Sequence, residues 1–284
     1  MARDTVRLVR RVDFEASHRL RVHSLSEAEN RERFGRECDL HGHNWALCVG
    51  FEGQVDPVTG MVVNIADVDD FLRAHVVAEL DHRRLDLDHA SFRDVPPTAE
   101  NVAVWVWARI GRPFDGVALV SVQVREGARA EAEYRGEPGR VDGTQMVELT
   151  RAYEFSASHR LHSDDMSDDE NRALYGKCNN PNGHGHDYRV EITVRGPVAC
   201  ETGGVVDVPW LDALAQREVV DRMHYRHLNT DVPELNGMAP TTENLTRAVF
   251  DLLAPAFEGA SADLRRVRVY ETPKSWFDCE AEST

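Results

Sequence analysis

Hydrophobic and polar residues alternate near the N-terminus in a way that predicts a β-strand. Phe14, Ala16 and His18 share one face of this strand, and the residues between them share the other. Two further segments are rich in β-branched and aromatic residues and end in glycine, which is typical of strands: residues 43–53 and 186–196. The strand signal therefore occurs in both halves of the chain.

Apolar residues follow the spacing of a helix in residues 65–80 and 99–110. Each segment comes directly after a residue that can cap a helix, Asn64 in the first case and Thr98 in the second. Strands interleaved with two helices indicate an α+β fold, in which an antiparallel sheet carries the helices on one face.

The motifs of the first half return in the second half. "VDFEASHRL", which contains His18, returns as "YEFSASHRL", which contains His159, and "HGH", "TGMVVN" and "PTAEN" return as "HGH", "GGVVD" and "PTTEN". A glycine-rich segment without periodicity separates the two sets. We therefore predict a tandem duplication with a first copy, a linker and a second copy at residues 1–136, 137–147 and 148–284.

Composition restricts the class of protein. The chain of 284 residues has a formal net charge of −16, which argues against nucleic acid or an anionic membrane as a partner. The longest apolar runs fall short of the roughly 20 residues that span a bilayer. The five cysteines are an odd number in a chain without an apolar leader, so we expect reduced thiols and a cytoplasmic protein.

Each copy has three histidines that we expect to converge. Residues i and i+2 of a strand point the same way, so both histidines of an "HGH" motif can face one point, and the histidine of the first strand can join them. Three neutral imidazoles with an open fourth position form the catalytic type of zinc site. A single "HGH" is more often a polar strand end, but its repetition favours Zn²⁺. The predicted ligands are His18, His41 and His43, and His159, His184 and His186.

Both copies resemble the 6-pyruvoyl-tetrahydropterin synthase and 6-carboxytetrahydropterin synthase family. The resemblance lies in "FEASHRL/FSASHRL", the cysteine before "HGH", "LDHRRLD", "PTAEN/PTTEN" and the late "REG/YET". It implies the tunnelling fold, with a four-stranded antiparallel sheet and two helices in each copy, and assembly of the copies into barrels. It also implies zinc on both histidine sets and 7,8-dihydroneopterin triphosphate as the substrate.

The second copy matches the catalytic residues of this family only in part. Cys178 stands where the family has its catalytic cysteine, and the resemblance implies that this thiol is the base. The aspartate and histidine of the family's "LDHxxLN" motif are replaced by His224 and Tyr225. The second copy thus has the cysteine and lacks the Asp-His pair.

The first copy shows the opposite loss. It keeps the pair as Asp81 and His82, but Glu37 occupies the register of the cysteine, and Cys38 is one residue out of register. In the family, the cysteine and the Asp-His pair of one site come from neighbouring subunits. We therefore expect a composite site in which Asp81 orients His82 for proton transfer and Cys178 acts as the base. Without the family context, Asp81 and His82 would be interpreted as surface residues, and decay of both copies is the competing explanation.

Further residues are predicted to bind the pterin. Glu126 and Glu271 lie late on a final strand, where a carboxylate can accept two parallel N–H bonds from an amino-pyrimidine edge. Thr98, Thr241 and Thr242 could add contacts to the ring, although the same residues are expected in helix caps.

The predicted function is that of a zinc-dependent lyase that forms 6-pyruvoyl-tetrahydropterin with loss of triphosphate. Two alternative reactions stay open: formation of 6-carboxytetrahydropterin in the deazaguanine pathway, and a cleavage that gives 6-hydroxymethyl-dihydropterin, to which Glu37 points. A zinc-containing pterin-binding protein without activity is the non-enzyme alternative. A homo-oligomer is expected, and three chains would supply six copies for a closed ring, so a homotrimer is the first hypothesis.

Overall fold

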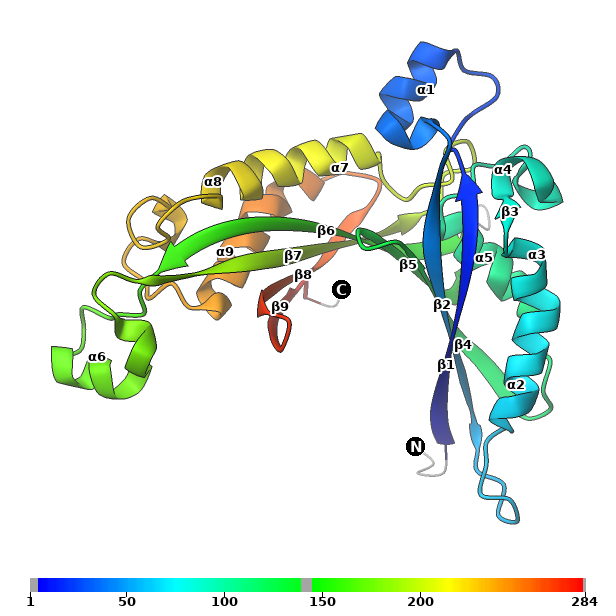
Figure 1. Cartoon of the computed structure of the whole chain (residues 1–284), viewed down its shortest axis with the longest axis horizontal. Coiled ribbons are helices and arrows are strands. Elements are labelled where there is room, and N and C mark those ends of the chain that lie inside the picture. The colour runs from blue at the N-terminus through cyan, green and yellow to red at the C-terminus, as the bar shows by residue number, and fades with distance from the viewer. Residues whose placement is uncertain (1–4, 139–144, 283–284) are drawn as a thin grey trace. The chain divides into compact units, whose positions relative to one another are not determined.

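The computed structural model describes residues 5–138 and 145–282 (Figure 1). The chain divides into two compact units: unit 1 contains residues 1–150 and 195–209, and unit 2 contains residues 151–194 and 210–284. Unit 1 therefore includes a segment of the second copy. The middle of the predicted linker lies outside the described residues, and its described ends belong to strands β5 and β6.

The first copy forms a mainly antiparallel sheet with the strand order β3-β1-β2-β4-β5. The side chains of Phe14, Ala16 and His18 are buried on one face of β1, as the alternation predicts. The short β3 runs parallel to β1, and the remaining neighbours are antiparallel. The strands are β1 (Thr5–His18), β2 (His41–Gln54), β3 (Arg83–Arg84), β4 (Val117–Glu126) and β5 (Ala130–Pro138).

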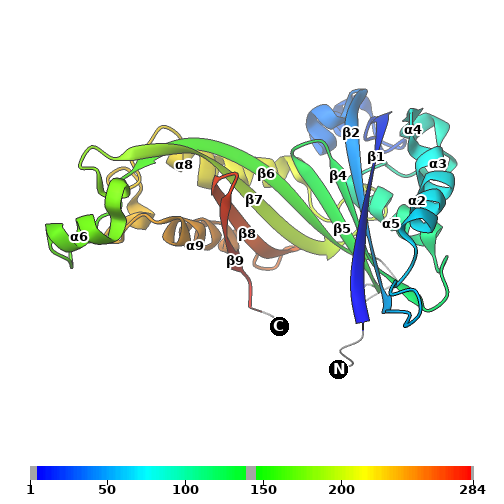
Figure 2. The ribbon, with the colours of Figure 1, turned by 60° about the horizontal axis from the view of Figure 1, so that its bottom comes forward.

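Two long helical segments pack on one face of this sheet (Figure 2). The segment predicted for residues 65–80 is α2 (Ile65–Leu72), a π-helical turn (Arg73–Val77) and α3 (Ala78–Leu80). The fully buried apolar residues of this segment are Val68, Leu72, Val76 and Leu80. The predicted second helix is α5 (Ala99–Ile110). Shorter elements are α1 (Glu27–Phe34), the 3₁₀ turn Gly35–Cys38, α4 (Leu85–Asp88) and the 3₁₀ turn Ala90–Phe92.

Helix starts are fixed by side chains that accept otherwise unpaired backbone N–H groups. Asn64 accepts from the N–H of Ala66, and Thr98 accepts from the N–H of Asn101. Both predicted caps are therefore confirmed.

The second copy repeats these elements. Its sheet has the order β6-β7-β8-β9, with β6 (Gln145–His159), β7 (His184–Pro197), β8 (Asp263–Thr272) and β9 (Ser275–Glu280). The helices are α6 (Asp168–Tyr175), α7 (Val208–Ala215), a π-helical turn (Gln216–Val220), α8 (Asp221–Met223) and α9 (Thr242–Leu253). Three 3₁₀ turns complete the described elements: Gly176–Asn179, Pro233–Leu235 and Ala254–Phe257. The predicted α+β tunnelling fold is confirmed.

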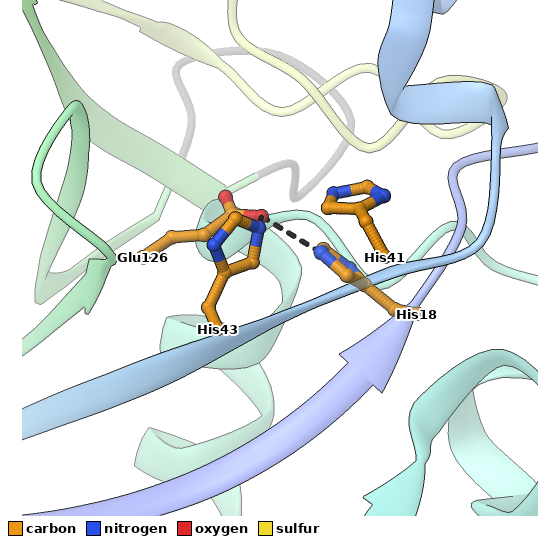
Figure 3. Close-up of side chains that lie close together, drawn as sticks. All are labelled: His18, His41, His43 and Glu126. Carbon is orange, nitrogen blue, oxygen red and sulfur yellow. Dashed lines mark ion pairs between the residues drawn. The ribbon is translucent and has the colours of Figure 1, made fainter.

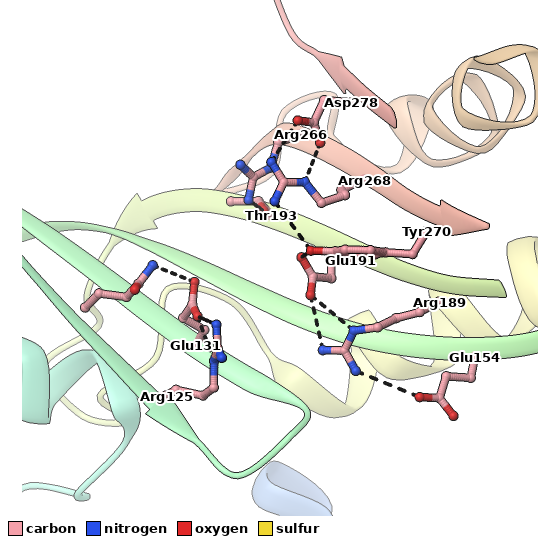
Figure 4. Close-up of polar contacts among 11 residues, drawn as sticks. Arg125, Glu131, Glu154, Arg189, Glu191, Thr193, Arg266, Arg268, Tyr270 and Asp278 are labelled. Atoms are coloured by element: carbon pink, nitrogen blue, oxygen red, sulfur yellow. Dashed lines mark hydrogen bonds and ion pairs between the residues drawn. The ribbon is translucent and has the colours of Figure 1, made fainter. Parts of the chain in front are cut away.

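The two faces of the β8 strand differ in chemistry. Val267 and Val269 are fully buried, whereas Arg268 points to the other face and forms an ion pair with Asp278 of β9. Figure 4 shows that this face continues across β7 as a series of charged and polar contacts. Cross-strand pairs of opposite charge stabilise a sheet modestly. They also leave the apolar side chains for the face that the helices cover.

Within residues 5–138 and 145–282, no helix has the length and apolar character needed to cross a bilayer.

Candidate active site

Strand pairing brings the three histidines of the first copy together. His18 ends β1 and lies opposite His41, the first residue of β2, while His43 lies opposite Ala16. Glu126 ends β4 opposite Trp45 of β2, so its carboxylate reaches the same point (Figure 3). The convergence that the i, i+2 spacing predicts is therefore present in the structure.

Backbone carbonyls orient these rings. The Nδ1 atom of His18 lies 2.9 Å from the carbonyl oxygen of Pro97, and Nδ1 of His41 lies 2.8 Å from that of Asp39. A carbonyl only accepts, so each Nδ1 carries a proton, and in the neutral ring Nε2 keeps the lone pair that a metal needs. The Nε2 atoms of His18 and His43 are buried without a hydrogen-bond partner of acceptable geometry. Metal-ligating histidines are held in this manner.

A carboxylate faces the same nitrogens. Oε1 of Glu126 lies 2.8 Å from Nε2 of His18 and 3.2 Å from Nε2 of His43. Burial opposes the charge on Glu126, but its contacts with the two imidazoles outweigh burial and hold its pKa below the ordinary value. Burial likewise opposes protonation of His18, yet the adjacent carboxylate raises the pKa of His18. The first copy therefore offers three nitrogens and one oxygen.

The second copy builds the same triad. Nδ1 of His159 lies 2.8 Å from the carbonyl oxygen of Pro240, and its Nε2 lies 3.1 Å from Nε2 of His184. Burial is the main cause that lowers the pKa of His159 and of His184, which favours their neutral, ligating forms. His186 completes the group, and all three ligand atoms lie within 4.8 Å of one another.

The glutamate of the second copy lies further from its histidines. Oε1 of Glu271 is 3.8 Å from Nε2 of His159 and 3.7 Å from Nε2 of His186. The hydroxyl of Thr242 donates a hydrogen bond of 3.1 Å to this same oxygen. The second copy thus offers three nitrogens with a carboxylate held beside them.

These donor sets fit a zinc-type ion. Zn–N bonds of 2.0–2.1 Å in a tetrahedron place neighbouring ligand atoms about 3.3 Å apart. The contacts of 2.8 and 3.2 Å in the first copy and 3.1 Å in the second are close to this separation. Imidazole and carboxylate are ligands that zinc accepts in proteins.

The Asp-His pair of the first copy forms an ordered dyad. Nδ1 of His82 lies 2.9 Å from Asp81, and the other oxygen of Asp81 accepts from the backbone N–H of Glu15 at 2.9 Å. The hydrogen bond from Asp81 raises the pKa of His82. His82 has a positive φ of 56°, which is uncommon for a residue with a side chain. Together with His43, it lines an open pocket of about 520 Å³.

The second copy replaces this dyad without changing the backbone. The N–H of Ser156 donates to Nδ1 of His224 at 3.0 Å, so His224 takes over the structural role of Asp81. Tyr225 has the φ of His82, 56°, and its ring contacts that of His224, with centroids 3.8 Å apart and the ring planes tilted by 32°. The Tyr225 side chain is 83% exposed. An aromatic ring in contact with His224 therefore stands where the first copy has a histidine held by a carboxylate.

Backbone hydrogen bonds show which residues correspond in the two 3₁₀ turns that precede β2 and β7. The N–H of Leu20 donates to the carbonyl of Glu37 at 2.8 Å, and the N–H of Leu161 donates to that of Cys178 at 2.9 Å. Cys38 is buried with Leu20 in a small apolar cluster. Glu37 and Cys178 thus occupy equivalent positions, and the thiol of Cys38 is directed into packing.

The predicted threonines lie at helix starts near the histidines. Thr98 and Thr241 cap α5 and α9, and the hydroxyl of Thr98 also donates to the carbonyl of Gly203 at 2.7 Å. Thr242 contacts Glu271 as described above. The contacts of the threonines with a pterin stay a prediction.

Sequence reasoning missed Glu100, which is almost fully buried next to this centre. Oε1 of Glu100 accepts from the backbone N–H of Val205 at 3.2 Å, a contact within unit 1. Burial raises the pKa of Glu100 to about 7. The glutamate of the repeated "PTAEN/PTTEN" motif was the available signal, but its counterpart Glu243 is exposed. Burial of Glu100 depends on a segment from the other copy, which the motif does not reveal.

Comparison with known proteins adds the family. The model of the 6-pyruvoyl tetrahydropterin synthase family matches residues 7–137 and again residues 148–282. The chain belongs to this family. It is therefore an enzyme of a lyase family, as predicted, and the two matches support the tandem arrangement.

Relatives correspond to one copy each in length. The 6-pyruvoyl tetrahydrobiopterin synthase of Poecilia reticulata is 41% identical over 45% of this chain and 85% of its own length. The enzyme of the same name from Homo sapiens is 40% identical over 45% of this chain and 90% of its own length. The structure of Caenorhabditis elegans 6-pyruvoyl tetrahydropterin synthase is 37% identical, with a TM-score of 0.47, over 49% of this chain and 98% of that chain.

Proposed function

We propose that the chain is a zinc-dependent synthase that converts 7,8-dihydroneopterin triphosphate into 6-pyruvoyl-tetrahydropterin with loss of triphosphate. The convergence of three histidine nitrogens in each copy is the observation that carries this proposal. A bound zinc ion would act as a Lewis acid that lowers the pKa of the substrate's vicinal hydroxyls. The relatives that carry the synthase name support the choice of reaction.

In the second copy, Cys178 is proposed as the base that removes the first proton. Its loop lies directly before β7, which begins with the ligand His184. Glu271 is proposed to accept N–H bonds from the amino-pyrimidine edge of the pterin, because Thr242 already holds one of its oxygens in place. Thr241 and Thr98 are proposed to support the ring site through the helix starts that they cap.

His82 is proposed to carry protons to and from the substrate. The hydrogen bond that Nδ1–H of His82 donates to Asp81 fixes the tautomer of the ring. Nε2 of this exposed ring is then left to exchange protons with a substrate. Asp81 and His82 belong to unit 1, whereas Cys178 belongs to unit 2. Their cooperation in one site therefore stays a proposal from the sequence. Glu37 is proposed as the candidate catalytic residue of the first copy, where its carboxylate would serve the alternative cleavage to 6-hydroxymethyl-dihydropterin.

We also propose a ring of chains, with a homotrimer as the first hypothesis. Within unit 1, Gly203 of the second copy lies against Asn101 of the first, so closely that a Cβ atom would meet the Asn101 amide at 2.2 Å. Its φ of 72° also requires glycine. The corresponding Gly60 of the first copy has no atoms within 4 Å of such a Cβ, and Met61 beside it is exposed. A second chain would give this segment the same contact, and head-to-tail contacts of this kind close into rings.

The test of the reaction is product analysis by mass spectrometry after incubation with 7,8-dihydroneopterin triphosphate. We expect 6-pyruvoyl-tetrahydropterin and released triphosphate, no product after chelation, and recovery with added Zn²⁺. Products with the masses of 6-carboxytetrahydropterin or 6-hydroxymethyl-dihydropterin would replace the proposed reaction with an alternative. Light scattering tests the ring, and a stable monomer at micromolar concentration would contradict it.

A further inference from the structure

The last glutamate of each copy is placed differently relative to its histidines. Oε1 of Glu126 lies at ligand-to-ligand distance from two imidazole nitrogens, 2.8 and 3.2 Å, and Figure 3 shows it directed toward them. Oε1 of Glu271 stays 3.7 and 3.8 Å away from its two nearest nitrogens. Neighbouring ligand atoms of one tetrahedral zinc ion lie about 3.3 Å apart, and the 3.2 Å contact of Glu126 is the one nearest to this separation. Glu126 also forms one four-residue group with His18, His41 and His43.

The two copies differ in the residue that follows the capping threonine of the second long helix. The hydroxyl of Thr242 donates a hydrogen bond to Oε1 of Glu271, the oxygen that is nearest the histidines. This hydrogen bond would compete with a bond from the same oxygen to a metal ion. The "PTAEN/PTTEN" repeat places Ala99 at the corresponding position of the first copy. Ala99 is buried, and its methyl group has no hydrogen-bond donor to offer the carboxylate of Glu126.

We propose that the first copy holds its metal in a closed four-ligand site of the structural type, with Glu126 as the fourth ligand beside His18, His41 and His43. The second copy keeps its fourth position open for substrate, with Glu271 held back by Thr242. Structural zinc sites are four-coordinate and closed, and catalytic sites keep one position free. This inference rests on the proposed function, because it requires that both triads bind metal.

Two further features of the first copy agree with a closed site. The side chain of Glu126 is 11% exposed and that of His18 is fully buried, so the carboxylate has little water to compete for it.

The first test uses full-length variants with one centre each. One variant combines His159→Ala with His184→Ala, so only the centre of the first copy stays intact. The other combines His18→Ala with His41→Ala, so only the centre of the second copy stays intact. Each protein is loaded with Co²⁺ and titrated with azide while the visible spectrum is recorded. The first centre should give a four-coordinate spectrum that azide does not change, and the second should bind azide with a spectral shift. An azide response of the first centre equal to that of the second would overturn the inference.

The second test compares matched glutamate variants in these single-centre proteins. Glu126→Gln should weaken zinc binding to the first centre about 10- to 100-fold, measured by competition with a chromogenic chelator. Glu271→Gln should change zinc binding to the second centre less than about threefold. Equal losses in the two copies would overturn the inference, and circular dichroism identifies any variant that fails to fold.

A residue exchange covers the case in which Glu126→Gln does not fold. Ala99→Thr should give the first centre an azide response, and Thr242→Ala should reduce that of the second. An unchanged first centre in Ala99→Thr would contradict the assigned role of the threonine. If neither single-centre protein binds Zn²⁺ or Co²⁺, the proposed function itself fails, whereas metal in both centres with identical behaviour refutes only the closed first site.

Discussion

The two copies of this chain keep the same framework and differ at the site that the framework supports. Both have a helix with a capping box after the first strand, Ser26 with Glu29 and Ser167 with Glu170. Both hold the first histidine through a proline carbonyl. At the site, however, Glu37 occupies the position that corresponds to Cys178, and the Asp81-His82 dyad corresponds to the ring pair of His224 and Tyr225. The helix caps and the contact of the first histidine serve folding, and they are the same in both copies. The proposed proton-transfer residues differ between the copies.

The copies also differ in what covers them. Glu100 is buried beneath Val205, whereas Glu243 of the second copy is exposed. The covering segment belongs to the second copy in sequence and to unit 1 in space. A duplicated chain can thus complete one copy with a segment of the other.

The largest expected effect is on turnover, and it should differ between substitutions in the turn before β7 and in the turn before β2. Cys178→Ala should lower turnover by about 10²–10⁴, because it removes the proposed base. Glu37→Ala, the matched change in the first copy, should change turnover less than about threefold. Steady-state rates at equal zinc content measure both. If Glu37→Ala abolished turnover and Cys178→Ala left it intact, the working centre would be in the first copy.

The second prediction concerns the dyad. His82→Ala should lower turnover by about 10², and the double variant with Cys178→Ala should be about as slow as the slower single variant, since groups that act as one unit are not additive. Tyr225→Phe is the matched control and should leave the rate nearly unchanged. Multiplication of the two single effects in the double variant would show that His82 and Cys178 act in separate sites.

The third prediction uses the difference between Glu100 and Glu243. The pKa of Glu100 is raised to about 7 from its ordinary 4.5, so the folded state binds this proton more tightly than the unfolded state. Its contribution should therefore make the metal-free protein less stable as the pH rises from about 4.5 to about 7, and constant above that.

Glu100→Gln removes this ionisation and should stabilise the metal-free protein at pH 8 by about 3 kcal/mol, with little gain near pH 4.5. Denaturant unfolding at the two pH values measures the difference. Glu243→Gln is the exposed control and should change the free energy of unfolding by less than about 0.5 kcal/mol. A pH-independent gain in Glu100→Gln would mean that Glu100 does not titrate between these values.

The smallest expected effect tests where the copies are alike. Ser26→Ala and Ser167→Ala each remove the acceptor for a helix N–H and should each cost about 1 kcal/mol in the unit that contains the helix. Thermal unfolding of the two variants should show similar shifts. A loss of more than about 2 kcal/mol in only one of them would show that the frameworks have diverged as well.

Local patterns in the sequence were sufficient for the elements and for the triads. The helix predicted at residues 99–110 has these bounds in the structure, because its cap and its apolar spacing are both local signals. The histidines converge because the i, i+2 rule and antiparallel pairing act over a few residues. The repeat is visible in the sequence, and it also predicted the fold of the second copy.

Only the tertiary structure decided which side chains share the site with the histidines. Glu126 comes close to His18 because β1 and β4 both pair with β2, although the two residues are far apart in the sequence. The burial of Glu100 depends on Val205, more than one hundred residues away. Such contacts are set by packing between elements, and packing depends on volumes and distances that no local pattern of residues records.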